Sequence, residues 1–127
     1  VTQKPKFFRV NWFRKDEKGK FIWPGFGHNM RVLKWVVDRV RGKADAIEGP
    51  FGLMPQYNDI PWEGLDFSVD QYHGIMDIAK EGALAEAAAL EAYFAKFGDR
   101  LPPEMKAQLQ AFAERARNAP DLWKIAS

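Results

Sequence analysis

The 127-residue sequence contains no cysteine and only two histidines, His28 and His73. Without cysteine the chain can form neither a disulfide nor a thiolate metal site. Neither histidine lies in an H-E-x-x-H or similar spacing that would hold a metal. We therefore expect no metal ligand in this segment. The lack of cysteine is also compatible with a cytoplasmic protein, which is the localisation that we expect.

Membrane and targeting segments are also missing from the sequence. No stretch approaches the roughly 20 consecutive apolar residues that span a bilayer, and no charged-then-apolar leader with a small-residue cleavage site is present. We therefore expect no membrane partner. At 127 residues and 46% hydrophobic composition, the chain suits one modest core rather than two domains. Its first residue, Val1 rather than methionine, suits a piece of a longer protein.

The sequence has no catalytic apparatus that can be recognised from spacing. There is no Gly-x-x-x-x-Gly-Lys-Ser/Thr, and the Gly-Lys pairs at 19–20 and 42–43 lack the earlier glycine and the hydroxyl of a phosphate cradle. The acidic pair Asp16 and Glu17 lies in a predicted turn, where both side chains are expected to be solvated. No nucleophile is paired with a base. We expect the chain to bind a ligand but to contain no catalytic residue.

Charge is unevenly distributed along the chain. Residues 1–43 carry twelve Lys and Arg against three Asp and Glu, a net charge of +9. The whole chain carries +2, so the remainder carries −7. We call residues 1–43 the basic head. Such a concentration of cations indicates a polyanionic partner, either the phosphates of a nucleotide or the backbone of a nucleic acid.

The most unusual stretch that is present covers residues 11–29, with five large aromatic residues, three glycines and cations between them. A charged turn at residues 15–19 and a Pro-Gly pair divide the rings and reverse the backbone. We expect a loop that displays Phe13, Phe21 and Phe26 around a common space, where a planar ligand could stack. The plain alternative is that these rings belong to the hydrophobic core.

The residues around the third phenylalanine support a binding role for the loop. Glycines on both sides of Phe26 allow positive φ or a close approach of the backbone to a ligand. Asn29 follows at a predicted helix start, and its amide offers both a donor and an acceptor, as reading a purine edge requires. Its alternative role is an N-cap. The supporting part of the loop consists of Trp23, Pro24, Gly25 and Gly27.

The pattern of the N-terminal third predicts strands, the loop and then a helix. Residues 7–13 predict a largely buried strand, and residues 21–23 predict a second strand that completes a hairpin. Residues 29–41 predict an amphipathic helix that ends at Gly42, with its N-terminal amides directed towards the aromatic loop. The apolar face of this helix has the spacing i, i+3, i+4, i+7, formed by Leu33, Val36, Val37 and Val40.

The rest of the chain predicts a packed connector followed by helices. Residues 44–68 are rich in turns but too apolar for a free linker, with one short strand near residues 51–54. Residues 69–98 predict helix with a break in the first half, because two glycines weaken it there. The segment Leu101-Pro102-Pro103-Glu104 opens a last helix with proline in its first turn, and the inner face of this helix consists of Met105, Leu109 and Phe112. We therefore divide the chain into 1–43, a strand, loop and helix; 44–68, the connector; and 69–127, the helical part.

Four consecutive motifs carry a resemblance to a known family: Asn11-Trp12-Phe13-Arg14-Lys15-Asp16, Gly19-Lys20-Phe21, Trp23-Pro24-Gly25-Phe26-Gly27 and Asn29-Met30-Arg31-Val32-Leu33. Together they resemble the guanine-binding segment of GTP-dependent phosphoenolpyruvate carboxykinase. Residues 64–66 and 93–102 resemble the closing helices of the same family. One departure is the pair Gly82-Ala83, where the family usually has a tryptophan.

The resemblance implies a function and a set of site residues. In this family three phenylalanines enclose guanine and an asparagine bonds its edge, which here correspond to Phe13, Phe21, Phe26 and Asn29. The parent enzyme converts oxaloacetate and GTP to phosphoenolpyruvate, CO2 and GDP in gluconeogenesis, with Mn2+ or Mg2+ bound outside this segment. The resemblance thus implies that the chain is an α+β fragment of a larger α/β enzyme and is inactive alone. Its partners would be a guanine nucleotide and the rest of the parent enzyme, namely the N-terminal lobe and the phosphate-binding loop. The parent enzyme would be a monomer.

Two other classes of function fit the residues alone. In a single-stranded nucleic-acid-binding module, the rings would stack on unpaired bases while the basic head tracked phosphates. In an interaction domain, the rings would be buried against a protein partner. With the resemblance taken into account, we expect no nucleic acid partner.

Overall fold

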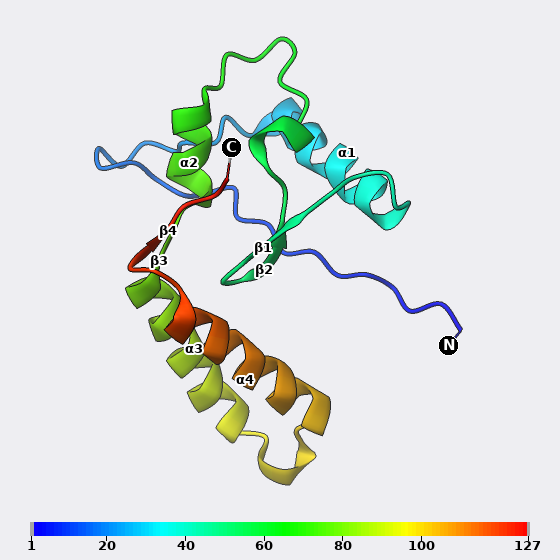
Figure 1. Ribbon diagram of the computed structural model, residues 1–127, viewed down its shortest axis with the longest axis vertical. Coiled ribbons are helices and arrows are strands. Elements are labelled where there is room, and N and C mark those ends of the chain that lie inside the picture. Colours follow the sequence, from blue (N-terminus) through cyan, green and yellow to red (C-terminus); the bar gives the residue numbers. More distant parts are fainter. Residues whose placement is uncertain (1, 127) are drawn as a thin grey trace. The chain divides into compact units, whose positions relative to one another are not determined.

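The computed structural model describes residues 2–126 and contains helices and short strands, so the predicted α+β class is confirmed. The chain divides into two compact units. Unit 1 comprises the N-terminal part up to Ile47, the segment Pro55–Met76 and Ala126, and unit 2 comprises Glu48–Met54 and Asp77–Ile125. Figure 1 labels the helices and strands of both units. Within residues 2–126, no helix is long and apolar enough to cross a membrane.

Unit 1 contains one longer helix that follows directly on a 3-10 turn. The turn η1 spans Phe26–His28, and helix α1 spans Asn29–Val40. The predicted end of the helix is confirmed, because Gly42 has φ 72° and its N–H donates to the carbonyl of Arg39. The Lys43 N–H donates to the Asp38 carbonyl, which completes a Schellman cap. The remaining elements of unit 1 are η2 at Tyr57–Asp59 and α2 at Val69–Met76.

The predicted strand at residues 7–13 is wrong, since this segment has no strand in the structure and Phe7 is 91% exposed. One physical reason is local, because the Asn11 side chain accepts a hydrogen bond from the Phe13 N–H and so occupies a donor that a β ladder would use. The predicted hairpin is reduced to a single antiparallel bridge between Lys15 and Phe21. The aromatic loop at residues 11–29 is therefore held by turns rather than by a sheet.

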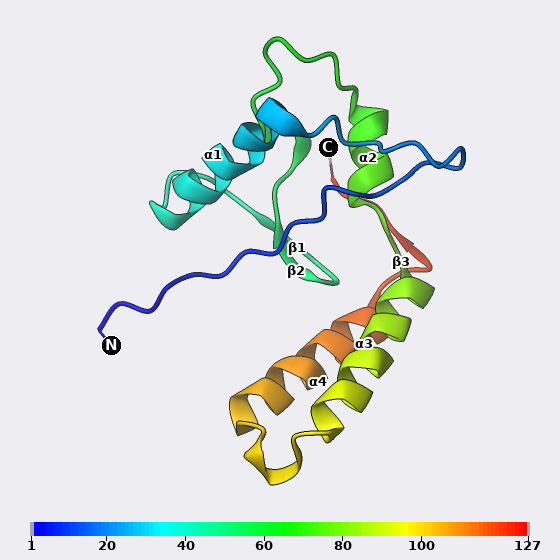
Figure 2. The ribbon, with the colours of Figure 1, turned by 180° about the vertical axis from the view of Figure 1, so that it is seen from behind.

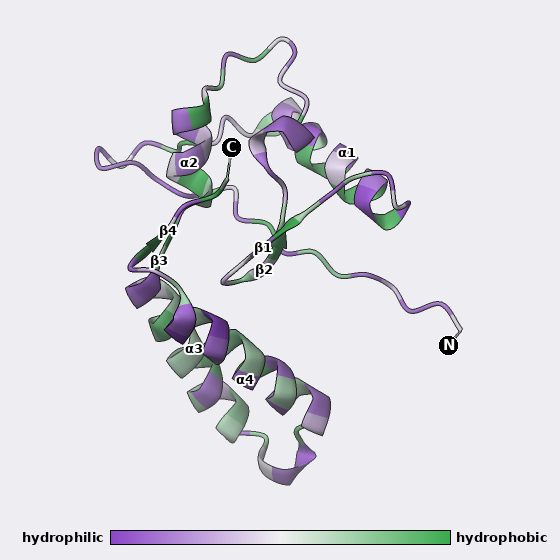
Figure 3. Cartoon of the chain, in the orientation of Figure 1, coloured by the Kyte–Doolittle hydropathy of each residue, from purple (hydrophilic) through white to green (hydrophobic). Residues whose placement is uncertain are grey.

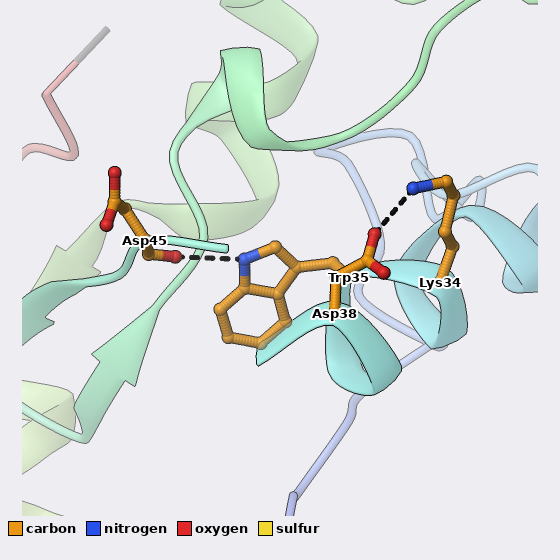
Figure 4. Close-up of polar contacts among 4 residues, drawn as sticks. All are labelled: Lys34, Trp35, Asp38 and Asp45. Atoms are coloured by element: carbon orange, nitrogen blue, oxygen red, sulfur yellow. Dashed lines mark hydrogen bonds and ion pairs between the residues drawn. The ribbon is translucent and has the colours of Figure 1, made fainter. Parts of the chain in front are cut away.

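The apolar face predicted for α1 does not form a core in the described part of the chain. Leu33, Val37 and Val40 are 42%, 45% and 50% exposed, whereas Trp35 is 5% exposed. The Trp35 indole N–H donates to the Asp45 carbonyl at 3.1 Å, which ties the helix to the segment that follows it (Figure 4). α1 is thus anchored by one tryptophan on the opposite side from its aliphatic stripe.

Unit 2 is a helical hairpin with two small antiparallel sheets. Strands β1 (Ile47–Gly49) and β2 (Gly52–Met54) form one sheet, and β3 (Ile78–Ala79) pairs with β4 (Leu122–Trp123) in the other. Helices α3 (Lys80–Ala95) and α4 (Pro103–Asn118) are joined through η3 (Gly98–Arg100) and lie side by side in both ribbon views (Figure 1 and Figure 2). The predicted break is confirmed, since β3 separates α2 from α3.

The core of unit 2 is built mainly from alanine. Ala83 and Ala116 are fully buried, and they cluster with Ala87 and Phe112 between α3 and α4. The aliphatic residues packed around this cluster are Ile78, Leu90, Leu109 and Ala113. Figure 3 shows hydrophobic residues alternating with hydrophilic ones along both helices. Of the inner face predicted for α4, Phe112 and Leu109 are confirmed, but Met105 is 43% exposed.

Candidate functional site

The candidate site is the loop at residues 11–29, and a compact turn forms its base. The Asp16 carboxylate accepts hydrogen bonds from the N–H groups of Lys18 and Lys20, both at 2.9 Å. The Asp16 N–H also donates to the Lys20 carbonyl. Asp16 was expected to be merely solvated, but it closes the turn, and the signal in the sequence is the preference of aspartate for turn starts.

Two of the three predicted phenylalanines lie together in the structure. The rings of Phe13 and Phe21 are 5.9 Å apart in an edge-to-face arrangement, and the two side chains are 70% and 50% exposed. The Lys15 ammonium group lies 5.1 Å from the centre of the Phe21 ring, within the range of a cation–π contact. The pair therefore presents apolar ring surface to solvent beside a positive charge.

The third phenylalanine is placed differently. Phe26 is 94% exposed and makes no ring contact among residues 2–126. Its φ is 50°, and it follows Gly25 with φ 71°. A left-handed conformation costs a non-glycine residue about 1–2 kcal/mol. The chain thus holds a large apolar side chain in solvent on a strained backbone, and backbone strain of this kind clusters at active sites and ligand clamps.

A buried tryptophan supports the loop from below. Trp23 is only 5% exposed, and its ring contacts those of Trp12, Trp62 and Phe67 at centroid distances of 6.1, 6.3 and 5.6 Å. Pro24 and Gly27 are exposed on either side of the strained Gly25-Phe26 pair. The loop therefore combines one buried ring that anchors it with three phenylalanine rings left in solvent.

Asn29 is half-buried and does not act as the N-cap that sequence reasoning offered as its alternative role. α1 begins at Asn29 itself, and the preceding His28 makes no side-chain cap hydrogen bond. The Asn29 side-chain oxygen instead accepts a hydrogen bond from the Trp23 indole N–H at 2.7 Å. The expected row of free amides at the helix start is also changed, because η1 engages the His28 N–H with the Gly25 carbonyl.

Arg31 is a supporting residue that the sequence did not reveal. Its guanidinium donates to the Pro61 carbonyl at 2.5 Å, to the Glu63 carbonyl at 2.7 Å and to His28 Nδ1 at 3.2 Å. These bonds tie the first turn of α1 to a segment about 30 residues further along the chain. No local pattern indicates such a contact, because both acceptors in the later segment are backbone carbonyls.

Among residues 2–126, no three Asp, Glu or His side chains gather in a way that could hold a metal ion. The pKa of Tyr72 is raised chiefly by burial and secondarily by the charge of Asp59, but its hydroxyl donates to the Pro55 carbonyl at 2.5 Å and serves packing. What the loop offers is ring surface, cations and one oriented amide.

Comparison with known proteins gives consistent matches. Residues 1–115 match the family described as phosphoenolpyruvate carboxykinase C-terminal P-loop domain. Phosphoenolpyruvate carboxykinase [GTP] from Arthrobacter sp. (strain FB24) is 46% identical over 111 residues, which cover 87% of this chain and 18% of the relative. The enzymes of the same name from Neocallimastix frontalis and Anaeromyxobacter dehalogenans are 41% and 40% identical, over 91% and 94% of this chain. The chain thus spans about a fifth of the length of these relatives, 18–20%.

Proposed function

The chain belongs to the phosphoenolpyruvate carboxykinase C-terminal P-loop domain family, and on that premise we propose that it is the guanine-binding part of a GTP-dependent phosphoenolpyruvate carboxykinase. In this proposal the parent enzyme converts oxaloacetate and GTP to phosphoenolpyruvate, CO2 and GDP. The metal ion and the phosphate-binding loop lie outside this chain in this proposal, since the sequence contains no Walker-type motif and residues 2–126 contain no cluster of ligands that could hold a metal. The chain alone binds and does not catalyse, and the parent acts as a cytoplasmic monomer.

The exposure of the three phenylalanines is the observation that carries this proposal. A free loop gains nothing by holding rings that are 50%, 70% and 94% exposed, while a guanine base inserted among them would remove that apolar surface from water. Stacking on aromatic side chains contributes about 1–3 kcal/mol per base in single-strand binders. Phe13, Phe21 and Phe26 therefore supply affinity for the base.

Discrimination between guanine and adenine comes from Asn29 in this proposal. Guanine carries an acceptor oxygen at position 6, where adenine carries a donor amino group. A donor placed against that position is satisfied by guanine and left unpaired by adenine, and an unpaired buried polar group costs about 1–3 kcal/mol. The cations of the basic head, such as Lys15 and Lys20, favour the approach of the phosphates.

Calorimetric titration with GDP and ADP tests the proposal, after circular dichroism has established that the chain is folded. We expect saturable binding of GDP that exceeds binding of ADP. Phe26→Ala should weaken GDP binding by about 5- to 150-fold, the equivalent of one stacked base. Phe7→Ala is the matched control, because Phe7 is 91% exposed in the same unit but lies outside the loop, and it should leave binding unchanged.

Two results would contradict the proposal. Affinity that rises with oligonucleotide length and falls steeply with salt would instead assign the rings and the basic head to single-stranded nucleic acid. If the folded chain binds no nucleotide, the same titration is made with the full-length protein, whose other segments supply the phosphate contacts. Equal affinity for GDP and ADP there would rule out a guanine site in this loop.

A further inference from the structure

The hydrogen bond between Trp23 and Asn29 has a chemical consequence for the site. An indole N–H is a donor only, whereas a side-chain amide has an acceptor oxygen at one end and a donor NH2 group at the other. At a separation of 2.7 Å the Trp23 indole must therefore face the oxygen of Asn29. The NH2 group of Asn29 is then left at the other end of the amide as a donor.

We propose that Trp23 is a positioning residue that sets the base selectivity of the loop by fixing the orientation of the Asn29 amide. The inference rests on the proposed guanine site and goes one step deeper, because it names what makes Asn29 a donor rather than an acceptor towards the base. A freely turning amide could offer its NH2 group to guanine O6 or its oxygen to the adenine amino group with equal ease. The indole removes the second option.

The packing around Trp23 makes this orientation costly to reverse. Trp23 is 5% exposed and is held by ring contacts to Trp62 and Phe67, so its N–H cannot turn away to find water. Turning the Asn29 amide by 180° would bring two donors face to face and leave the buried indole N–H of Trp23 unpaired. Since an unsatisfied donor in a buried setting costs more than a hydrogen bond gains, one orientation prevails.

Trp23→Phe tests the inference in the full-length protein, with Kd measured for GDP, IDP and ADP. IDP shares the position-6 oxygen with GDP but lacks its 2-amino group, so it reports on recognition of that oxygen alone. We expect Trp23→Phe to weaken GDP and IDP alike and to strengthen ADP. The ratio of ADP to GDP dissociation constants should fall by about tenfold, the equivalent of one hydrogen bond. A purely structural role would weaken all three nucleotides and could not strengthen ADP.

Trp62→Phe is the matched control, because the Trp62 indole belongs to the same ring cluster but donates to the Tyr57 carbonyl at 2.8 Å instead. It should leave the ratio unchanged. Replacing Trp23 by 3-benzothienylalanine, which has sulfur in place of the indole N–H, keeps the ring and guards against a variant that fails to fold. If the wild-type protein prefers GDP and the benzothienyl variant has the same ratio of ADP to GDP dissociation constants, the positioning role of Trp23 is wrong, but the proposed guanine site stands. A wild-type protein without a preference for GDP overturns the proposed guanine site as well.

Discussion

Each of the two units of the chain has its own core, and the two cores differ in kind. In unit 1 the buried residues are mostly aromatic, and the polar ends of this aromatic cluster are paired with specific acceptors: the buried Trp35 indole with Asp45, the buried Tyr72 hydroxyl with Pro55, and the half-buried Trp62 indole with Tyr57. In unit 2 the central cluster consists of three alanines and one phenylalanine, whose side chains contain no polar atom. Each unit is thus sensitive to a different change.

The difference between the aromatic core of unit 1 and the alanine core of unit 2 explains why the candidate site lies in unit 1. Aromatic rings with hydrogen-bonded ends are fixed in direction as well as in depth, so they can support a loop whose outer rings remain in solvent. An alanine core instead depends on how closely two helices approach, which makes a rigid hairpin but offers no directed polar group. Unit 1 should therefore respond to changes in polar atoms, and unit 2 to changes in volume.

The largest effect on stability is expected from added volume in unit 2. Ala116 is fully buried between α3 and α4, so Ala116→Leu should overpack the core and lower the free energy of unfolding by about 1–3 kcal/mol. Ala111→Leu places the same side chain on an exposed position of the same helix and should be nearly neutral. Urea unfolding followed by circular dichroism measures both. Equal effects of the two variants would mean that the alanine contact between the helices is not a packed core.

Because the stability of unit 1 depends on buried polar atoms, its free energy of unfolding should be sensitive to alkaline pH. Burial, and then the charge of Asp59, raise the pKa of Tyr72 above its ordinary value, so the folded protein keeps this proton at a pH where the unfolded chain has lost it. The stability that Tyr72 contributes is therefore complete below about pH 10 and falls as the pH rises further, by at most about 1.4 kcal/mol per pH unit.

Tyr72→Phe should remove this alkaline loss, although it costs the hydrogen bond to Pro55 at neutral pH. The measurement is the urea midpoint at a series of pH values between about pH 7 and pH 11. Tyr93→Phe is the control, since Tyr93 is 52% exposed, and it should retain the wild-type pH dependence. A Tyr72→Phe protein that loses stability above pH 10 as steeply as the wild type would show that another group is responsible.

A third prediction separates stability from binding at the loop. Phe26 has φ 50° and is 94% exposed, so Phe26→Gly relieves backbone strain while removing no buried surface. The relief of about 1–2 kcal/mol is offset by the greater freedom of glycine in the unfolded chain, about 0.5–1 kcal/mol. Thermal unfolding should therefore show a melting temperature that is unchanged or slightly higher, while GDP affinity falls. A marked loss of stability would mean that the Phe26 ring supports the loop.

Local patterns in the sequence were enough to predict several boundaries of the helices. The end of α1 followed from Gly42, because glycine adopts its φ of 72° at no steric cost. The start of α4, at Pro103, lies within the Leu101-Pro102-Pro103-Glu104 segment that predicted it. The break between α2 and α3 followed from weak helix formers. Each of these features is decided by residues within one or two turns of the chain.

Features that depend on distant partners were not predictable in the same way. The strand expected at residues 7–13 would need a neighbouring strand, and within residues 2–126 none pairs with it. The bonds from Arg31 to residues 61 and 63 join backbone groups that any sequence would supply. At the candidate site, the sequence proposed the aromatic residues and Asn29, which stay predictions, but it did not indicate the hydrogen bond from the Trp23 indole to the Asn29 side chain.

The smallest effect is expected at the surface of α1, where Lys34 forms an ion pair with Asp38 one turn later (Figure 4). The hydrogen bond from the Lys34 ammonium, with the charges of Lys34, Lys43 and Arg41, holds the pKa of Asp38 below its ordinary value of 3.8. The stability that this carboxylate contributes is thus present above that value and is lost as the pH falls through the lower folded pKa.

Asp38→Asn should lower the urea midpoint only slightly at neutral pH, because an exposed pair is well screened. Since Debye screening strengthens with ionic strength, the difference from wild type should shrink in high salt and vanish in acid. A difference that persists under both conditions would show that the effect of Asp38→Asn does not come from the charge of the carboxylate.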